Sequence, residues 1–371
     1  MSAITRMVIK LGTSTLTKGT PHLSREAMIE VTRQVVELYR RGIKVVLVTS
    51  GAHTAGRDIV SFSELEKSLP SKQMFSAVGQ VSLMQLWSEL FAKHKIHIGQ
   101  ILLTRSDFSE RSPYLNVRDT IYALLDHGII PIVNENDPVA TKHSFVGDND
   151  NLGAHISNMI AAHLFVILTD QHGLYDKDPG TNPDATLIRL VKSIDDQVVE
   201  AAKNSSTKYG TGGMATKITA SLLASHSGTP TEITSIKTPD VLIKLADGAM
   251  IGTRFTAITS PRESRKRWLL SEKPQGSVEV DQGASNKLLT SGASLLPIGI
   301  TSLNGTFERG ALIEVKGVNE LIGVGLSNYS SQEIDQIKRR HSNVIEQVLG
   351  YTFGPEVIHR DNMVITGGHH D

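Results

Sequence analysis

Short apolar runs alternate with amphipathic stretches along the first two-thirds of the chain. An apolar run bounded by glycine or polar residues predicts a buried strand, whereas apolar residues three and four positions apart predict a helix. The predicted strands are Met7–Leu11, Ile43–Val48, Ile96–Leu103, Ile129–Val133 and Leu164–Thr169, and the predicted helices lie between Ser24 and Gly42 and over 71–94, 113–127 and 150–162. Because parallel strands need crossover connections, this alternation predicts an α/β fold with a mostly parallel sheet.

Two of the predicted helices carry further signals. Ser24 is a favoured N-cap residue, and Gly42 follows the last apolar position of the first helix. The apolar residues on or near one side of the helix over 71–94 are Met74, Val78, Val81, Met84 and Leu90. We expect that side to face the core.

The pattern changes near residue 260, where a charged run and a Pro/Gly stretch precede short β-type segments. The elements predicted here are strands at Ser277–Val280, Leu295–Ile300, Ala311–Val315, Leu321–Leu326 and Glu356–Ile358, and one helix over 331–349. A chain of 371 residues has room for two or three domains. We therefore predict a domain over 1–260, a linker over 261–275, a small β-rich module over 276–360 and a tail over 361–371.

Composition excludes several classes of function. The 38 Lys and Arg residues balance the 38 Asp and Glu residues, which argues against a purely electrostatic nucleic-acid binder. The absence of cysteine excludes disulfides, cysteine-ligated zinc, iron–sulfur clusters and thiolate nucleophiles. No apolar run is long enough for a membrane span and the N-terminus lacks a secretory signal, so we expect a cytoplasmic protein without a membrane partner.

Polar residues gather where four of the predicted strands end. The segments are Gly12–Ser14, Thr49–Gly51, Asn134–Asp137 and Thr169–Asp170. Parallel α/β sheets bind ligands at the carboxyl ends of their strands, so these segments predict a ligand site. Lys10 and Gly12 suit a phosphate cradle, because glycine allows close backbone approach and lysine adds charge, although an ordinary turn has the same composition.

Two glycine- or acid-rich segments lie outside these strand ends. Tyr209–Lys217 is a glycine loop before a helix and suits an anion, but it lacks the ending of a Walker A loop and follows no strand as a dinucleotide fingerprint would. Val146–Asn151 opens a helix with four polar side chains, where capping is one interpretation. The other interpretations are orientation of lysines, Mg²⁺ binding through water, or binding of an amino group.

These segments together resemble the amino acid kinase superfamily, and within it the glutamate 5-kinase family. The matching residues are Val8–Ser14, Val48–Ala52, Ala77–Gln80, Leu102–Arg105, Val133–Asp137, Val146–Leu152, Leu168–Tyr175 and Gly210–Lys217. Ser294–Ile300, Asn328–Ser331, Leu349–Tyr351 and Val357–Asp361 look like the PUA domain that many of these kinases carry. The resemblance implies a three-layer αβα sandwich of the amino acid kinase fold, followed by that small β-rich domain.

The resemblance also implies an activity and its residues. The reaction would be ATP-dependent phosphorylation of the side-chain carboxylate of L-glutamate to L-glutamyl 5-phosphate, the first step of proline biosynthesis, with Mg²⁺ on the ATP phosphates. Lys10 and Lys217 would stabilise the transferring phosphoryl group and Asp150 would hold both lysines. Glutamate would contact Ser50, Gly51, Asp137, Asp148 and Asn149. ATP would contact Lys10, Gly12, Thr169, Asp170, Thr211, Gly212, Gly213, Met214, Ala215, Thr216 and Lys217, with backbone N–H donors near Gly12, Gly51 and Gly212–Gly213.

Partners and alternatives follow from the same resemblance. It implies a homo-oligomer and inhibition by proline, for which 107–119 is the candidate segment, and it permits RNA binding by the PUA domain. The basic run Arg262–Arg267 has acidic neighbours and few aromatic residues, which favours an interdomain or oligomer contact over RNA. His53 stands where an aliphatic residue is common, and we predict a surface or capping role for it. The alternatives are a kinase for aspartate, acetylglutamate or UMP, or an RNA-binding protein with a degenerate kinase core.

Overall fold

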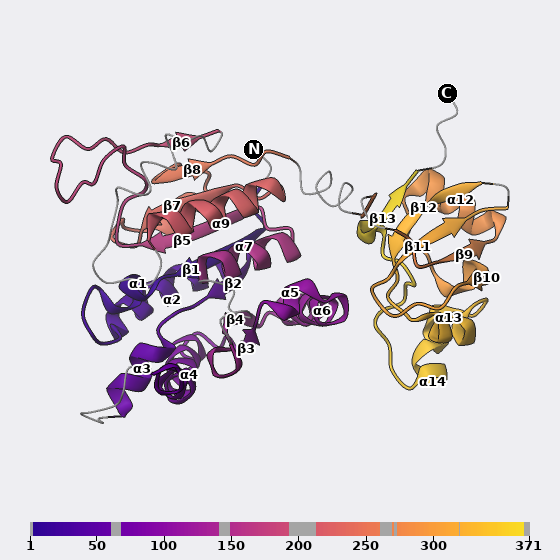
Figure 1. Ribbon diagram of the computed structural model, residues 1–371, viewed down its shortest axis with the longest axis horizontal. Coiled ribbons are helices and arrows are strands. Elements are labelled where there is room, and N and C mark those ends of the chain that lie inside the picture. Colours follow the sequence, from indigo (N-terminus) through magenta and orange to yellow (C-terminus); the bar gives the residue numbers. More distant parts are fainter. Residues whose placement is uncertain are drawn as a thin grey trace. The chain divides into compact units, whose positions relative to one another are not determined.

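The structure is a computed structural model that describes residues 3–60, 68–140, 149–192, 213–259, 269–270, 273–318 and 320–366. The chain divides into two compact units, the first made of 1–109 and 116–261 and the second of 110–115 and 262–371. Each unit has its own sheet (Figure 1). No helix in the described part is both long and apolar enough to cross a membrane.

The first unit contains an eight-stranded sheet of order β3-β4-β2-β1-β5-β7-β8-β6. Its strands are β1 (Arg6–Leu11), β2 (Lys44–Val48), β3 (Ile98–Leu103), β4 (Ile130–Glu135), β5 (Leu164–Thr169), β6 (Leu190–Val191), β7 (Thr231–Ser235) and β8 (Thr253–Phe255). All neighbours are parallel except β7 and β8. The prediction of a mostly parallel α/β sheet is therefore confirmed, and the predicted strand at Leu164–Thr169 has the observed bounds.

Helices cover both faces of this sheet (Figure 1). The helices of the unit are α1 (Thr13–Thr17), α2 (Arg25–Arg40), α3 (Ala52–Ile59), α4 (Leu69–Ala92), α5 (Ser106–Ser109), α6 (Arg111–Asp126), α7 (Asn149–Met159), α9 (Met214–His226) and α10 (Val241–Ala246). Side chains of β1 alternate between the faces. Met7 and Ile9 join the core under α2, α4 and α10, so Val8 and Lys10 face α7 and α9.

Local signals explain where α2 begins and ends. The Ser24 hydroxyl accepts a hydrogen bond from the Ala27 amide, which satisfies one of the free N–H groups of the first turn. The left-handed φ of +78° at Gly42 then turns the chain into β2. Ser24 and Gly42 bound the helix as predicted.

The core-facing side of α4 differs in part from the predicted one, since Leu90 is buried and Met84 packs against the core as expected. Val81 is 71% exposed, and the buried residues of the helix are Ser76, Gly79, Leu83, Trp87, Leu90 and Phe91. The reason is that α4 packs closely on α3, so that small residues occupy the contact. A Cβ atom on Gly79 would lie 1.8 Å from the Ala52 carbonyl oxygen. Apolar periodicity misses the part of this face that Ser76 and Gly79 form.

The second unit holds a five-stranded sheet of order β10-β9-β11-β12-β13. Its elements are β9 (Gly276–Val280), α12 (Gln282–Ser291), β10 (Ile300–Asn304), β11 (Leu312–Lys316), β12 (Leu321–Leu326), α13 (Ser331–Ile337), α14 (Ile345–Leu349) and β13 (Met363–Ile365). The unit has its own apolar core, which includes Val278, Ile313 and Tyr329. The predicted strand at Leu321–Leu326 has the observed bounds.

Several predictions in this unit were wrong. The helix over 331–349 is two helices, because Lys338 is extended and Arg339 has a left-handed φ of +62°. Pro297–Gly299 is a 3₁₀ helix rather than strand, and Glu356–Ile358 contributes only an isolated bridge to Leu295. Helix α12 was not predicted, and β13 lies within the range expected to be a tail.

We expect Gly79→Ala to lower the free energy of unfolding by about 2 kcal/mol. Alanine is the better helix former by about 1 kcal/mol, but overpacking a tight contact costs about 1–3 kcal/mol, and here backbone atoms meet the new methyl group. Val81→Ala, on the exposed side of the same helix, is the control and should change stability by less than about 0.5 kcal/mol. Denaturant unfolding of both variants checks this, and a stable Gly79→Ala protein would contradict the close packing of α3 and α4.

Candidate active site

The candidate site lies where the carboxyl ends of β1, β2, β4 and β5 meet α7 and α9. Lys10 is the penultimate residue of β1, Asn149 and Asp150 begin α7, and Lys217 is in the first turn of α9. Lys10 is in register with Val48 of β2 and Ile167 of β5, so it occupies the middle of the sheet. Three segments far apart in sequence thus converge on one point of the α7/α9 face.

A buried ion-pair group occupies this point. Asp150 Oδ1 lies 2.6 Å from Lys10 Nζ, and Asp150 Oδ2 lies 3.2 Å from Lys217 Nζ. Asp150 is fully buried, and the lysines are 6% and 7% exposed. The Thr216 hydroxyl also donates to Asp150 Oδ2 at 3.0 Å. One carboxylate between two ammonium groups leaves a net charge of about +1 in a buried place, which suits an anion.

Packing and charge both fix the protonation state of Asp150. Gly153 allows α7 to approach the sheet, since a Cβ there would lie 2.6 Å from the Phe165 ring. Burial alone raises the pKa of Asp150, but the charges of Lys10 and Lys217 outweigh it and hold the pKa below the ordinary carboxyl value. Asp150 therefore remains ionised at neutral pH.

The predicted phosphate-binding segments border the two lysines. Gly12 has an ordinary φ of −72°, and its amide donates a long 3.4 Å hydrogen bond to the Leu168 carbonyl. This amide is therefore engaged within the sheet, and the Gly12 Cα lies beside Lys10, since a Cβ there would be 3.6 Å from Lys10 Nζ. Gly213 caps α9 and has open space around it. A phosphate near Lys10 and Lys217 would also meet the positive end of α9.

The other predicted ATP residues are placed at the edges of this group. Met214 and Lys217 of α9 are buried, whereas Ala215 is exposed and Thr216 is half-buried. At the end of β5 the Thr169 hydroxyl donates to Asp170 Oδ1 at 3.0 Å. Thr211 and Gly212 lie outside the described residues, as does Asp148 of the predicted glutamate site.

Two of the predicted glutamate residues are hydrogen-bonded to each other. Asn149 Nδ2 donates to Ser50 Oγ at 2.9 Å and to the Thr49 carbonyl at 2.8 Å. Gly51 turns the chain from β2 into α3 with a φ of +98°, a conformation that favours glycine. Because Asn149 precedes Asp150, the Ser50–Asn149 pair is adjacent to the buried ion-pair group.

Asp137 follows β4 and has a different environment. Burial raises the pKa of its carboxyl above the ordinary value, while a hydrogen bond from Ser76 and the charge of His53 oppose this. His53 is half-buried rather than on the surface, and its ring packs edge-on against Phe75 with centroids 5.5 Å apart. Burial lowers the pKa of His53, so the neutral imidazole is favoured. No sequence signal indicates the contact between His53 and Phe75, because it depends on how α3 packs against α4.

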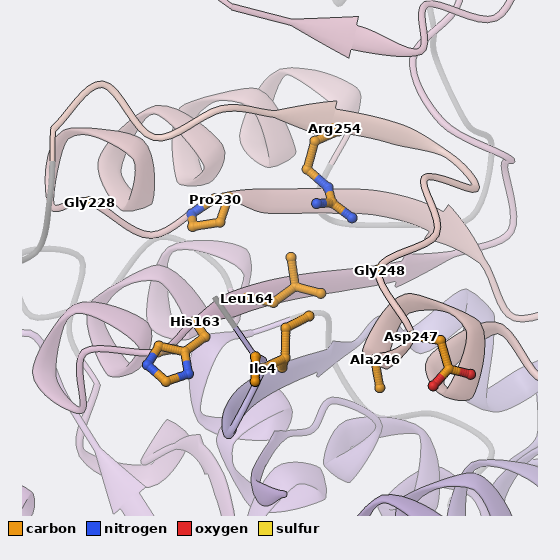
Figure 2. A pocket seen from close by; sticks show the side chains of 11 residues that line it. Ile4, His163, Leu164, Gly228, Pro230, Ala246, Asp247, Gly248 and Arg254 are labelled. Carbon is orange, nitrogen blue, oxygen red and sulfur yellow. The ribbon is translucent and has the colours of Figure 1, made fainter. Parts of the chain in front are cut away.

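A separate cavity of about 370 Å³ lies at the amino ends of β1, β5 and β7. Figure 2 shows His163 and Arg254 on opposite walls of it. The Arg254 guanidinium pairs with the buried Glu232 and donates to the Ala249 carbonyl at 3.2 Å. Asp247 at its rim pairs with Arg41 at 2.9 Å. This cavity is therefore distinct from the candidate active site, which lies at the opposite ends of the strands.

A parallel α/β sheet whose strand ends hold a buried Lys–Asp–Lys group defines an enzyme that handles phosphate. The chain belongs to the amino acid kinase family, whose model matches residues 5–235. The PUA domain model matches residues 276–349, within the second unit.

Curated relatives match along nearly the whole chain. A glutamate 5-kinase of Photobacterium profundum is 47% identical over 361 residues, covering 97% of this chain and 96% of the relative. A glutamate 5-kinase of Sodalis glossinidius is 45% identical over 366 residues, covering 98% and 100%. Among solved structures, a UMP kinase from Bacillus anthracis matches 69% of this chain and 98% of its own with a TM-score of 0.48 and 16% identity.

We expect Asp150→Asn to destabilise the fold more than Lys10→Met. The first removes the negative charge that lies between two buried ammonium groups, which costs about 3–5 kcal/mol, whereas the second keeps the Lys217–Asp150 pair. Asp126→Asn breaks an equally short but exposed pair with Lys44 and should cost less than about 1 kcal/mol. Denaturant unfolding without nucleotide measures all three. Equal losses for the first two variants would show that charge balance does not govern this group.

Proposed function

We propose that this protein transfers the γ-phosphoryl group of ATP to the side-chain carboxylate of L-glutamate. The products are L-glutamyl 5-phosphate and ADP, and the reaction is the first step of proline biosynthesis from glutamate. The observation that carries this proposal is the buried Lys10–Asp150–Lys217 group beside the Ser50–Asn149 pair. The first suits a phosphoryl group and the second suits the polar groups of an amino acid.

The transfer is direct. A side-chain carboxylate oxygen of glutamate attacks the γ-phosphorus, the bond from the γ-phosphorus to the β–γ bridging oxygen breaks, and ADP leaves with that electron pair. Catalysis then consists of positioning and charge stabilisation. Lys10 and Lys217 lie close enough together, through Asp150, to neutralise charge on the transferring group and on the leaving oxygen.

The nucleotide occupies the β1, β5 and α9 side of the site. The residues that contact ATP are Gly12, Thr169, Asp170 and 211–217, and the phosphates lie beside Gly213, where no described atom is close. Mg²⁺ supplies additional charge neutralisation on the phosphates. In the described part of the chain no three His, Cys, Asp or Glu side chains cluster as metal ligands.

Glutamate occupies the β2, β4 and α7 side. The residues that contact it are Ser50, Gly51, Asp137, Asp148 and Asn149. The ionised carboxylate of Asp137 binds the ammonium group of glutamate. These residues favour an acceptor with an amino group over UMP.

We further propose that the protein is a cytoplasmic homo-oligomer. Its kinase domain comprises residues 1–260 and its PUA domain residues 276–360. RNA binding by the PUA domain is the less favoured alternative.

The first test is ATP turnover by the purified protein with Mg²⁺ and hydroxylamine. We expect glutamate-dependent ADP release and hydroxamate formation, and little turnover with aspartate, acetylglutamate or UMP. Lys217→Ala should lower the rate about 10²–10³-fold, as is typical for loss of one electrostatic stabiliser. Lys93→Ala, an exposed lysine at the end of α4, should leave the rate unchanged. Turnover only with another acceptor would overturn the substrate, and near-normal turnover in Lys217→Ala would remove this lysine from the mechanism.

We also propose that proline inhibits this enzyme through the segment 107–119. Phe108 of α5 stacks on His155 of α7 with ring centroids 4.7 Å apart, and α7 begins with Asn149 and Asp150. A ligand that moves α5 would therefore act on the helix that carries the site. A proline titration at low glutamate should show inhibition, which Phe108→Ala weakens several-fold without a change in kcat. Constant turnover across the titration would refute the proposal.

A further inference from the structure

Four amide side chains form a hydrogen-bonded series that leads from the exposed Gln100 to Asn149. Gln100 Oε1 on β3 accepts from Gln80 Nε2 on α4 at 3.1 Å, and Gln80 Oε1 accepts from Asn134 Nδ2 on β4 at 2.8 Å. Asn134 Oδ1 accepts in turn from Asn149 Nδ2 at 3.1 Å. Each amide thus donates to the next with its nitrogen, so that Asn149, Asn134, Gln80 and Gln100 form one head-to-tail series, which we call the amide relay.

The direction of the amide relay is fixed at one end. The Thr49 carbonyl has no proton to donate, so the side-chain group of Asn149 that faces it at 2.8 Å must be the nitrogen. Asn134 must then face Asn149 with its oxygen, which leaves its nitrogen for Gln80. Gln80 Oε1 holds Asn134 in that orientation and prevents the two asparagine nitrogens from facing each other.

This direction determines what the site offers to a ligand. The two hydrogens of Asn149 Nδ2 are shared among three acceptors, whereas the buried Asn149 Oδ1 receives no hydrogen bond within the described residues. Ser50 Oγ accepts from Asn149, so the hydroxyl proton of Ser50 is available to donate elsewhere. A free acceptor and a free donor side by side complement an ammonium group and a carboxylate.

We propose that Gln80 and Asn134 are positioning residues that select substrates with an amino group. The amide relay commits the nitrogen of Asn149 to the protein and leaves its oxygen as the acceptor for an ammonium group. A dicarboxylate without an amino group has only acceptors to offer at neutral pH and meets an unsatisfied oxygen there. This inference rests on the proposed function, because it takes glutamate to lie against Ser50 and Asn149.

The matched comparison is between the Gln80→Met and Gln80→Glu variants. Methionine keeps the length of the side chain but cannot accept from Asn134, whereas glutamate can, and the exposed Gln100 can turn to donate to it. We expect Gln80→Met to raise KM for glutamate about five- to tenfold, as expected for one lost hydrogen bond, with kcat within about twofold and KM for ATP unchanged. Gln80→Glu should remain close to wild type.

Two further measurements separate positioning from a purely structural role. The ratio of kcat/KM for glutamate to kcat/KM for glutarate, which lacks the amino group, should be smaller in the Gln80→Met variant than in the wild-type protein. Asn134→Leu should raise KM for glutamate in the same way, and the double variant should be no worse than Asn134→Leu alone, because Gln80 acts through Asn134. Should Gln80→Met fail to fold, Gln80→Glu against Gln80→Lys makes the same comparison, since only the first can accept.

The outcomes are distinguishable from those for the proposed function. If the wild-type protein forms no hydroxamate from glutamate, the proposed function fails. If it does and Gln80→Met retains both the wild-type KM and the wild-type preference over glutarate, the amide relay has no positioning role. Additive effects of the Gln80 and Asn134 variants would also overturn it.

Discussion

The ion-pair group of Lys10, Asp150 and Lys217 is the constraint on which the rest of the site depends. Each of these side chains is buried, and a buried charge is tolerated only when it is paired. Asp150 therefore fixes the positions of the end of β1 and the starts of α7 and α9 relative to one another. The glycine at position 153 is part of the same arrangement, because it allows α7 to lie close enough to β1 for the pair to form.

The same group explains the division of the site into two halves. Its two lysines come from β1 and α9, and Gly213 at the start of α9 has no described atom within 4 Å of the place that a Cβ would take. On the other side, Asn149 turns away from the charges and toward β2 and β4, where its nitrogen is bound by Thr49, Ser50 and Asn134. Two consecutive residues of one helix, Asn149 and Asp150, thus serve two different kinds of recognition.

The sequence predicted the sheet better than the helix surfaces. Buried strands such as Leu164–Thr169 are continuous apolar runs, and their bounds can be read directly. The buried side of α4 escaped prediction because Ser76 and Gly79 are not apolar, and the helix over 331–349 was predicted as unbroken because no proline marks the turn at Arg339. For the site, polar strand ends and the family resemblance indicated Lys10, Asp150 and Lys217, but spacing alone places no side chain beside another. The amide relay was missed because amides on α4, β4 and α7 look like ordinary polar residues until tertiary packing joins them.

Charge and hydrogen-bond direction contribute different kinds of selectivity here. An ammonium group attracts any phosphate or carboxylate, so Lys10 and Lys217 select for an anion and not for a particular amino acid. An amide held in one direction distinguishes a donor from an acceptor, and a buried oxygen left without a donor penalises the wrong ligand more than a good contact rewards the right one. In this protein the direction is set at the Thr49 carbonyl, which belongs to the backbone and cannot be altered by a side-chain substitution. If glutamate lies against Asn149 as proposed, discrimination among acceptors in this protein depends on Asn134 and Gln80, which hold Asn149, as well as on the residues that touch the substrate.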